Sequence, residues 1–296
     1  MLSKLLHYDK PALQVCHNLA FEELKLYMVE SGHSINLVEC RPGGTLGVFS
    51  YAEIDGVKKF IKTHLPGEDY RLNVLKEIQI LKCLYNDVLS VEQKELKLNG
   101  INYSFLIMDF LEENTQFLSL KEVQNSINNY TEKLTQIDAI STINGMYNLN
   151  QIYDEAARAI PLLVDNNLLS QEVAARCSDH LSYIKEIIDK SKKVVCHGDL
   201  SNKNILRLNN QPIIIDWEDS FIGIEDYDLC YWLSFFDQKQ YHNSELFRLT
   251  QISPNNLIAF MVLIVLAKCW LSYKNHSYKS NIMSFNQRLT EILSIN

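Results

Sequence analysis

The sequence predicts an α+β chain folded in two lobes. Its 296 residues correspond to two domains of about 150 residues each, or to one large domain. Short strand-like segments and turn signals fill the part before residue 110, whereas long helical patterns dominate the part after it. Runs of strands followed by runs of helices are typical of α+β architectures. We therefore predict one lobe at residues 1–110 and a second at residues 111–296.

The first lobe is predicted to be a mostly antiparallel sheet with one key helix. Apolar residues at helical spacing predict helices over residues 11–30 and 70–85. Extended segments are predicted at 35–40, 48–51 and 57–63, with a glycine-rich turn at 42–47. The pair Asn99-Gly100 separates the apolar segments 95–98 and 101–108, which is the strongest short-range signal for a β-hairpin.

The second lobe is predicted to be mainly helical. Helical spacing covers residues 118–140, 152–163, 171–189, 227–236 and 255–273, and a last helix lies near the C-terminus. Two short strand-like pieces, 194–208 and 212–217, interrupt this series around a polar loop. The longest apolar run, residues 257–267, is too short to span a bilayer and predicts a buried core helix.

Composition excludes several functional classes. Hydrophobic residues make up 47% of the chain, which argues against disorder, and the net charge of −8 argues against binding along a nucleic-acid backbone. The seven cysteines are odd in number and form no CxxC pair, which favours buried reduced thiols over disulfides or a zinc site. No signal-peptide pattern stands at the N-terminus, so we expect a cytoplasmic protein that binds neither membrane nor nucleic acid.

The residues that point to chemistry lie between positions 196 and 218. The segment Cys196-His197-Gly198-Asp199 is followed by Asn204, and Ile213-Ile214-Ile215 leads into Asp216-Trp217-Glu218. The five-residue spacing from Asp199 to Asn204 is that of a kinase catalytic loop, and an acid after a following apolar strand supplies a second metal ligand. Hard cations prefer oxygen ligands, and a separate carboxylate can receive the proton of an incoming hydroxyl.

This pattern, His-Gly-Asp-x-x-x-x-Asn followed by Ile-Asp-Trp-Glu, resembles the aminoglycoside phosphotransferase and choline kinase families. The resemblance extends faintly over residues 30 to 275. It implies a protein-kinase-like fold with an N-terminal nucleotide-binding lobe and a C-terminal catalytic and acceptor-binding lobe. It also implies ATP and Mg²⁺ as cofactors, Asp199 as the catalytic base, and Asn204 and Asp216 as metal ligands. Protein kinases usually carry His-Arg-Asp and Asp-Phe-Gly at these two places, so Gly198 and the pair Trp217-Glu218 favour the small-molecule branch.

Other parts of such a site follow in the expected order. The turn that contains Gly44 and Gly47 is similar to the loop that covers the phosphates, and Lys62 follows fifteen residues after Gly47. The resemblance implies that Lys62 holds the α- and β-phosphates and that Glu77 is its ion-pair partner. The segment from Asp109 to Leu111 resembles the hinge whose backbone groups meet adenine. No P-loop pattern is present.

Several of these residues also have simpler interpretations. Asp199, Asn204 and Asp216 could each cap a turn or a strand end. Lys62 and Glu77 could each be solvated. The functional interpretation is favoured because all of these residues occur together and in the order that the family has. We interpret His197 as a brace of the loop. Glu218 could contact the metal or the acceptor or act as a local brace, and Asp228 matches an acid that supports the catalytic region.

Two larger features are also open to two interpretations. Glu218, Asp219, Glu225, Asp226 and Asp228 could attract an amine-bearing acceptor or could include the start of a helix. Tyr231, Trp232, Trp270 and Tyr273 could form an aromatic cage for a cation, although helical spacing is more typical of core residues.

The function that these observations favour is transfer of the γ-phosphate of ATP to a hydroxyl of a small, amine-bearing molecule. Two alternatives remain: a nucleotide-binding pseudokinase or regulatory module without turnover, and a protein kinase. The stretch between Asp216 and Asp228 is short for an activation loop, which argues against a protein kinase. The acceptor and the oligomeric state are not predicted.

Overall fold

The computed structural model describes residues 10–43, 47–112, 118–135, 148–188, 190–243, 245–280 and 282–295. The chain divides into two compact units, which we treat separately. The N-terminal unit comprises Leu2–Gln116 and Lys203–Asp219, and the C-terminal unit comprises Phe117–Asn202 and Ser220–Asn296. The division predicted at residue 110 differs from this one, chiefly because residues 203–219 belong with the N-terminal unit.

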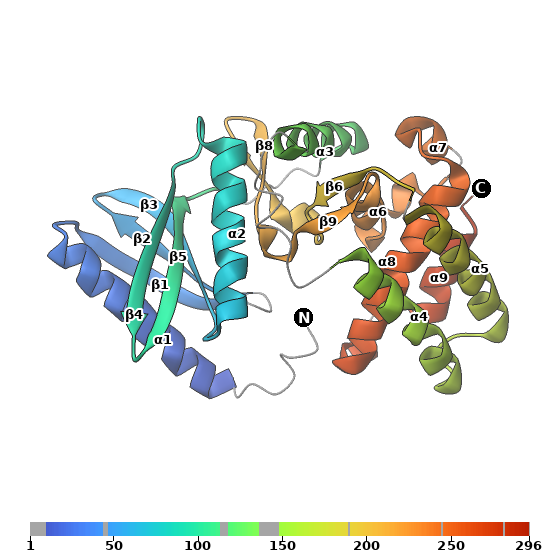
Figure 1. Cartoon of the computed structure of the whole chain (residues 1–296), viewed down its shortest axis with the longest axis horizontal. Coiled ribbons are helices and arrows are strands. Elements are labelled where there is room, and N and C mark those ends of the chain that lie inside the picture. The colour runs from blue at the N-terminus through green and yellow to red at the C-terminus, as the bar shows by residue number, and fades with distance from the viewer. Residues whose placement is uncertain are drawn as a thin grey trace. The chain divides into compact units, whose positions relative to one another are not determined.

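The N-terminal unit is built on a five-stranded antiparallel sheet with the order β1-β2-β3-β5-β4 (Figure 1). Both predicted helices and the predicted strands are present, and Asn99 and Gly100 both have positive φ (50° and 81°), as a tight hairpin turn requires. The elements are α1 (Lys10–Glu30), β1 (Ile35–Gly43), β2 (Gly47–Ile54), β3 (Val57–His64), α2 (Glu68–Tyr85), β4 (Val91–Leu98) and β5 (Ile101–Asp109).

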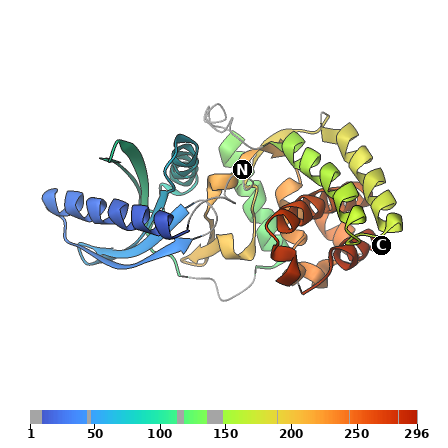
Figure 2. The ribbon, with the colours of Figure 1, turned by 90° about the horizontal axis from the view of Figure 1, so that it is seen from below.

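The two helices of this unit have different partners on the sheet. Helix α1 lies along one face of the sheet (Figure 2). Its residues Phe21, Leu24 and Met28 belong to a buried core with sheet residues that include Ile61 and Phe105. Side chains alternate between the two faces of a strand. Lys62 therefore points away from the face that Ile61 gives to α1, toward the side where α2 packs on β3, β4 and β5.

Residues 203–219 complete the N-terminal unit with a small hairpin. Strands β7 (Ile205–Leu208) and β8 (Gln211–Ile214) pair antiparallel, with Asn209 and Asn210 at positive φ in the turn. The hairpin lies between two short 3₁₀ helices, η3 (Asn202–Asn204) and η4 (Trp217–Asp219), and η4 packs on α2. The hydroxyl of Tyr85, at the end of α2, accepts a hydrogen bond of 2.9 Å from the Ile214 amide. The hairpin is therefore attached to α2 by both packing and a hydrogen bond.

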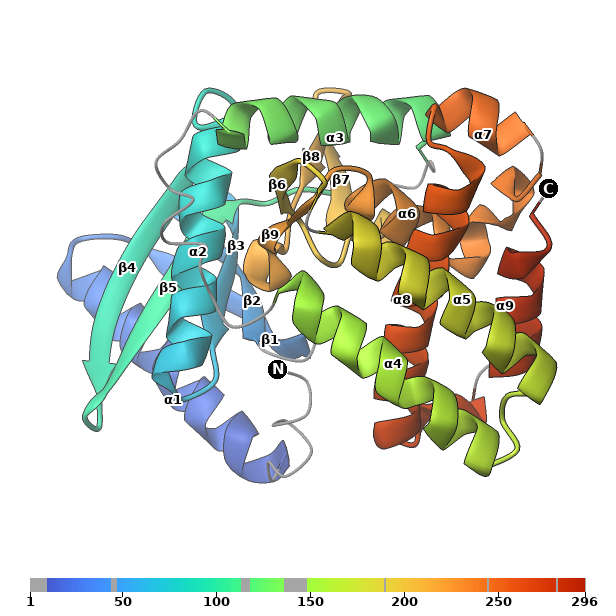
Figure 3. The same ribbon diagram turned by 45° about the vertical axis from the view of Figure 1, so that its right-hand side comes forward.

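The C-terminal unit is mainly helical, as predicted. Helices α4, α5 and α9 pack around α8 (Figure 3). The elements are α3 (Leu120–Thr135), α4 (Leu149–Asp165), α5 (Gln171–Ile188), β6 (Lys193–Cys196), β9 (Phe221–Ile224), α6 (Tyr227–Leu233), η5 (Phe236–Tyr241), α7 (Glu245–Thr250), α8 (Pro254–Lys274), η6 (Ser277–Ser280) and α9 (Phe285–Leu293). The final residues of the helix predicted over 118–140 lie outside the described residues.

Helix α8 is the core of this unit. Every residue of the apolar run 257–267 is buried except Ile258, which is half-buried, so the prediction of a core helix is confirmed. Among the described residues, α8 is also the one helix long and apolar enough to cross a membrane by length and composition, and 61% of its most apolar window is buried inside the protein. Burial by α4, α5 and α9 accounts for its apolar character.

One strand of the C-terminal unit has no counterpart among the predicted elements. Residues Phe221–Ile224 form β9, which pairs antiparallel with β6. The long strand-like piece predicted at 194–208 is in fact two strands in different units, β6 and β7, separated by the loop that carries Asp199.

Candidate active site

A buried cluster of charged side chains surrounds Lys62 in the N-terminal unit. The Lys62 ammonium lies 2.8 Å from Glu77 Oε2, 2.5 Å from Asp216 Oδ1 and 3.3 Å from Glu218 Oε2. Side chains from three separate parts of the sequence, β3, α2 and the segment after β8, are thus brought together. The structure places Lys62, rather than Lys58 or Lys59, in this cluster.

Glu77 is buried because it lies on the face of α2 that packs inward. Val74, Ile78 and Leu81 share this face at helical spacing, and Glu77 is only 2% exposed. Its two oxygens hold different groups: Oε2 accepts from Lys62, and Oε1 accepts a hydrogen bond of 2.9 Å from the Asp216 amide. Glu77 therefore joins the lysine on β3 to the backbone that carries Asp216.

The electrostatics of the cluster follow from three carboxylates around one ammonium. Burial alone would lower the pKa of Lys62, but Asp216, Glu218 and Glu77 together raise it well above its ordinary value of 10.5. Burial raises the pKa of Glu218 to about 8, and Asp216 and Glu77 act in the same direction while Lys62 opposes them. The cluster thus carries more negative charge than its lysine balances, which favours a further cation.

Asp216 and Asn204 stand at the same end of the β7–β8 hairpin. Ile205 pairs with Ile214, and the Ile215 amide donates a hydrogen bond of 2.9 Å to the Asn204 carbonyl, so Asn204 lies opposite the residue before Asp216. Asp216 has a φ of 67°, a left-handed conformation that Asp and Asn tolerate better than most residues. The Trp217 indole N–H donates to the Ile214 carbonyl at 2.8 Å and fixes the turn that follows.

The oxygen atoms of this region fit a hard divalent cation. Carboxylate oxygens of Glu77, Asp216 and Glu218 lie within 4.8 Å of one another, and the Asp216 side chain is 37% exposed. Mg²⁺ prefers such oxygen ligands, together with waters or phosphate oxygens. The donor set therefore fits magnesium, with Asp216 as the accessible carboxylate.

In the C-terminal unit, the loop after β6 presents Asp199. Gly198 has a φ of 87°, a conformation that favours glycine, and this explains glycine at that position. The buried His197 ring accepts a hydrogen bond of 3.2 Å from the Asp199 amide through Nδ1. His197 therefore acts on the backbone of the loop, as a brace.

Asp228 holds the same loop from α6. Its carboxylate accepts hydrogen bonds from the His197 amide at 2.7 Å, the Gly198 amide at 3.1 Å and the Tyr130 hydroxyl at 2.5 Å. Burial raises the pKa of Asp228, while His197 and these donors act to lower it. The loop that carries Asp199 is thus tied to α6 and, through Tyr130, to α3.

Asp199 itself has a partner that sequence reasoning did not assign. The Tyr231 hydroxyl donates a hydrogen bond of 2.7 Å to Asp199 Oδ1. The ammonium of Lys268 lies over the ring of Tyr231, 3.7 Å from the ring centroid. Among the other aromatic residues considered for a cage, Trp232 is buried and donates to Asn202 Oδ1 at 2.8 Å, and Tyr273 stacks on Tyr278.

The residues predicted for nucleotide contact are described in part. The Asp109 carboxylate pairs with Lys59 at 2.7 Å and accepts from the Ser90 amide at 2.8 Å. The amides of Asp109 and Phe110 donate to the carbonyls of Ser90 and Lys58, and Leu111 is buried. Of the predicted hinge, Asp109 therefore supports the sheet through its side chain and its amide.

The glycine turn is only partly described. Gly47 begins β2, where it pairs with Gly43 on β1 and with His64 on β3, so the turn does connect two neighbouring strands. Gly44 lies outside the described residues.

The five acids between positions 218 and 228 are divided between the two units. Glu218 faces Lys62, and Asp219 belongs to the same unit, whereas Glu225, Asp226 and Asp228 belong to the other. Glu225 pairs with Lys192 at 3.5 Å on the surface, and Asp228 holds the loop backbone. At the start of α6, Asp226 occupies the N-cap position without a side-chain cap bond.

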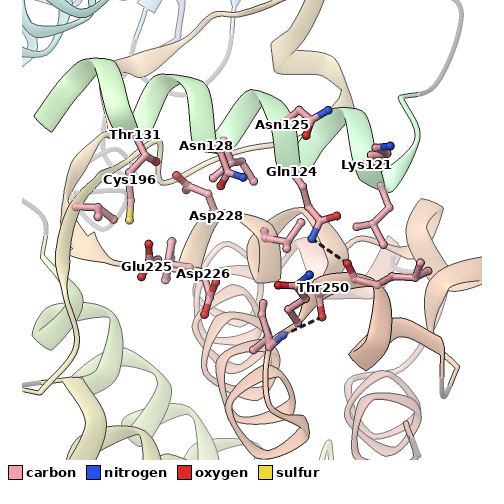
Figure 4. Close-up of a pocket in the computed structure, with 18 of the residues that line it drawn as sticks. Lys121, Gln124, Asn125, Asn128, Thr131, Cys196, Glu225, Asp226, Asp228 and Thr250 are labelled. Atoms are coloured by element: carbon pink, nitrogen blue, oxygen red, sulfur yellow. Dashed lines mark hydrogen bonds between the residues drawn. The ribbon is translucent and has the colours of Figure 1, made fainter.

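A cavity of about 740 Å³ lies within the C-terminal unit. Figure 4 shows polar side chains of α3, including Gln124, Asn125 and Asn128, on one side of it and the acids Glu225 and Asp226 on another. The carboxylate of Asp228 lines the cavity, but Asp199 does not. The cavity therefore adjoins the support of the loop and not the predicted base.

Comparison with known proteins identifies the family. The model of the phosphotransferase enzyme family matches residues 58–243, more than half of the chain and all of the motifs described above from Lys62 to Asp228.

The chain belongs to the phosphotransferase enzyme family.

Solved structures share the fold of this family member at low sequence identity. A thermostable mutant of aminoglycoside phosphotransferase APH(4)-Ia, in a ternary complex with ADP and hygromycin B, has a TM-score of 0.59 and 13% identity, over 92% of this chain and 96% of that one. Spectinomycin phosphotransferase, APH(9)-Ia, in complex with ADP and spectinomycin, has a TM-score of 0.61 and 12% identity, over 92% and 98%.

A third solved structure extends the range of activities found on this fold. The microcompartment-associated aminopropanol kinase has a TM-score of 0.57 and 14% identity, over 93% of this chain and 94% of that one. These likenesses establish the kinase-like α+β fold, and membership of the family makes the protein a phosphotransferase. A search of curated proteins gives no match.

Proposed function

We propose that the protein transfers the γ-phosphoryl group of ATP, with Mg²⁺, to a hydroxyl of a small amine-bearing molecule. The observation that carries this proposal is the buried cluster in which Lys62 meets Glu77, Asp216 and Glu218. A lysine held by an acid on the helix after its strand, next to a metal-binding acid, is the arrangement that protein kinases use for phosphoryl transfer from ATP. Structures of the same fold contain ADP or AMP-PNP, which supports a nucleotide donor.

In this proposal the N-terminal unit binds the nucleotide. Lys62 contacts the α- and β-phosphates, the turn with Gly44 and Gly47 covers them, and backbone groups near Leu111 meet adenine. Asn204 and Asp216 hold Mg²⁺, which when bound neutralises charge on the phosphates. Glu218 adds a carboxylate beside the metal ligands, and Glu77 keeps both Lys62 and Asp216 in place.

Asp199 receives the proton of the acceptor hydroxyl or orients that hydroxyl. Asn204 follows it by only five positions, so a fully extended chain limits the distance between their Cα atoms to about 18 Å. The bonds of His197 and Asp228 to the loop hold its backbone, which a general base requires. The hydroxyl oxygen then attacks the γ-phosphorus, the bond between the γ-phosphorus and the oxygen that bridges it to the β-phosphate breaks, and ADP leaves.

The acceptor is proposed to be small because the chain leaves little room for a peptide-binding segment. Between Asp216 and α6, which begins at Tyr227, the residues form η4 and β9. An activation segment of the kind that protein kinases use is therefore replaced by a strand paired with β6. An amine-bearing acceptor is supported by the names of the solved relatives, which act on aminoglycosides or an amino alcohol.

An assay of ADP release tests this function. The full-length protein with Mg-ATP is offered a panel of aminoglycosides, choline and 1-amino-2-propanol, and at least one acceptor should raise ADP release above the rate with water. Asp199→Asn should lower kcat by about 10²–10⁴-fold and leave nucleotide affinity unchanged. Asp179→Asn, an exposed acid on α5, is the matched control and should keep full activity.

The metal role is tested by binding. Asp216→Ala should abolish Mg²⁺-dependent ATP binding measured by calorimetry, because it removes the accessible carboxylate of the cluster. Full Mg²⁺-dependent binding in this variant would contradict that role. Binding of Mg-ATP without turnover on any acceptor would instead indicate a nucleotide-binding module.

A further inference from the structure

The predicted base is held by a side chain from a neighbouring helix. Tyr231, on α6, donates its hydroxyl hydrogen to Asp199 Oδ1 at 2.7 Å. The same helix carries Asp228, whose carboxylate accepts from the His197 and Gly198 amides just before Asp199. Both ends of the Tyr231–Asp199 bond are therefore fixed to one helix, one through its side chain and one through the backbone of the loop.

The ring of Tyr231 is in turn covered by a half-buried cation. Lys268 of α8 places its ammonium 3.7 Å from the ring centroids of both Tyr231 and Phe235 and donates a hydrogen bond of 2.9 Å to Ser234 Oγ. Within the part of the chain that the structure describes, no carboxylate forms an ion pair with Lys268. The ammonium therefore contacts the faces of two aromatic rings and has no carboxylate among the described residues in ion-pair contact.

The charged and titratable groups near Lys268 come from three elements. Burial lowers the pKa of Lys268, and Arg288 of α9 acts in the same direction, whereas Asp199 and Cys269 raise it. Arg288 donates to the Ser234 carbonyl at 2.7 Å, so it anchors the end of α6. Loss of hydration of this half-buried ammonium opposes folding, whereas a methionine at the same position would carry no charge.

We propose that Tyr231 and Lys268 are positioning residues for Asp199. The Tyr231 hydroxyl fixes Oδ1, and fixing one oxygen of a planar carboxylate also sets the direction of Oδ2 toward the acceptor hydroxyl. The ammonium of Lys268 draws electron density from the Tyr231 ring, which makes the hydroxyl a stronger donor to Asp199. This inference rests on the proposed role of Asp199 as the base or hydroxyl-positioning group.

Kinetics with matched variants test the proposal. Tyr231→Phe removes one hydroxyl and keeps the ring under Lys268, and Tyr183→Phe removes a hydroxyl that donates to Asn256 at the same distance of 2.7 Å. Tyr231→Phe should lower kcat about tenfold, keep the nucleotide KM within about twofold, and move the acidic limb of the kcat profile to higher pH. Tyr183→Phe should change none of these.

The contribution of the cation has its own control on the same helix. Lys268→Met should lower kcat, as Tyr231→Phe does, and Lys268→Arg should retain most of the activity. Lys274→Met removes an ammonium that lies 4.7 Å over the Trp270 ring and should leave kcat unchanged. If Lys268→Met does not fold, Tyr231→Phe still decides the outcome.

A spectroscopic measurement separates this inference from the proposed function. In protein labelled with ¹³C at tyrosine Cζ, the signal lost in Tyr231→Phe identifies Tyr231. That signal should shift in Asp199→Asn and in Lys268→Met or Lys268→Arg, and should not shift in Lys274→Met. A wild-type protein without acceptor-dependent ADP release would overturn the proposed function, whatever the signal does.

Two results would overturn the positioning role. One is a Tyr231 signal that does not shift in Asp199→Asn, which would mean that the hydrogen bond between Tyr231 and Asp199 is not formed in solution. The other is an active wild type in which Tyr231→Phe has the kcat and the pH profile of Tyr183→Phe.

Discussion

Replacing Glu77 by alanine should destabilise the protein far more than replacing an acid of the same helix whose ion pair is even shorter but exposed. Glu77 makes two charge-assisted hydrogen bonds in a buried setting, to Lys62 at 2.8 Å and to the Asp216 amide at 2.9 Å. Each such bond contributes about 1.5–3 kcal/mol, and Lys62 keeps two other carboxylates when Glu77 is lost. We therefore expect Glu77→Ala to lower the free energy of unfolding by about 3–4 kcal/mol.

The matched control is Glu68→Ala, at the start of α2. Glu68 pairs with Arg71 at 2.6 Å, closer than Glu77 lies to Lys62, but the Glu68 side chain is 59% exposed. Solvent screens such a pair, so its removal should leave the urea midpoint nearly unchanged. Glu77→Gln should fall between the two, because an amide oxygen can still accept one of the two hydrogen bonds.

Urea unfolding followed by tryptophan fluorescence measures these differences, because Trp217 is fully buried beside the cluster. Equal midpoints for Glu77→Ala and Glu68→Ala would refute the reasoning. That result would mean that burial does not decide the strength of these ion pairs.

Three further outcomes are expected. Burial lowers the pKa of Lys76 from 10.5 to about 8, so between these pH values the unfolded chain binds more protons than the folded one, and the free energy of unfolding rises with pH by up to about 3 kcal/mol. The amount by which Lys76→Met stabilises the protein in urea unfolding should therefore shrink from pH 7.5 to pH 10, and a constant difference would contradict this. A Cβ on Gly223 would lie 2.5 Å from Cys196 Sγ, so Gly223→Ala should lower the free energy of unfolding by about 1–3 kcal/mol, measured by thermal unfolding. Adding Cys196→Ala should restore part of this stability, and a double variant as unstable as Gly223→Ala would contradict the clash with Cys196. Tyr130→Phe removes the donor at 2.5 Å from Asp228 and should cost about 1.5–3 kcal/mol in urea unfolding, and an unchanged midpoint would show that this bond does not support the loop.

The residues that sequence reasoning identified are those whose relation is local in the chain. Asp199 and Asn204 are five residues apart, and Asp216 directly follows an apolar strand, so their spacing carries the information. Asn99-Gly100 predicted its hairpin for the same reason, since the turn depends on two adjacent residues. That β5 also pairs with β3 depends on packing across the sheet, which no local pattern contains.

The residues that sequence reasoning did not assign depend on how distant elements pack. Tyr231 meets Asp199 across 32 residues, and its helical spacing is the same whether its hydroxyl reaches a carboxylate or solvent. Lys268 follows an apolar run, and such a lysine could equally be the last, solvent-exposed residue of a helix. In the structure α8 continues to Lys274, so Lys268 lies within the helix and not at its end. Four residues are too few for periodicity to reveal β9.

The inclusion of residues 203–219 in the N-terminal unit has a consequence for the modularity of the protein. A fragment that ends at Gln116 would contain Lys62 and Glu77 but would lack Asp216 and Glu218, and the face of α2 that packs on η4 would be open to water. The unit is assembled from two separate stretches of chain, so a single cut cannot release it as an intact piece. Exchange of nucleotide-binding halves between relatives by one crossover would therefore break the lysine cluster, and a working chimaera needs both stretches from the same parent.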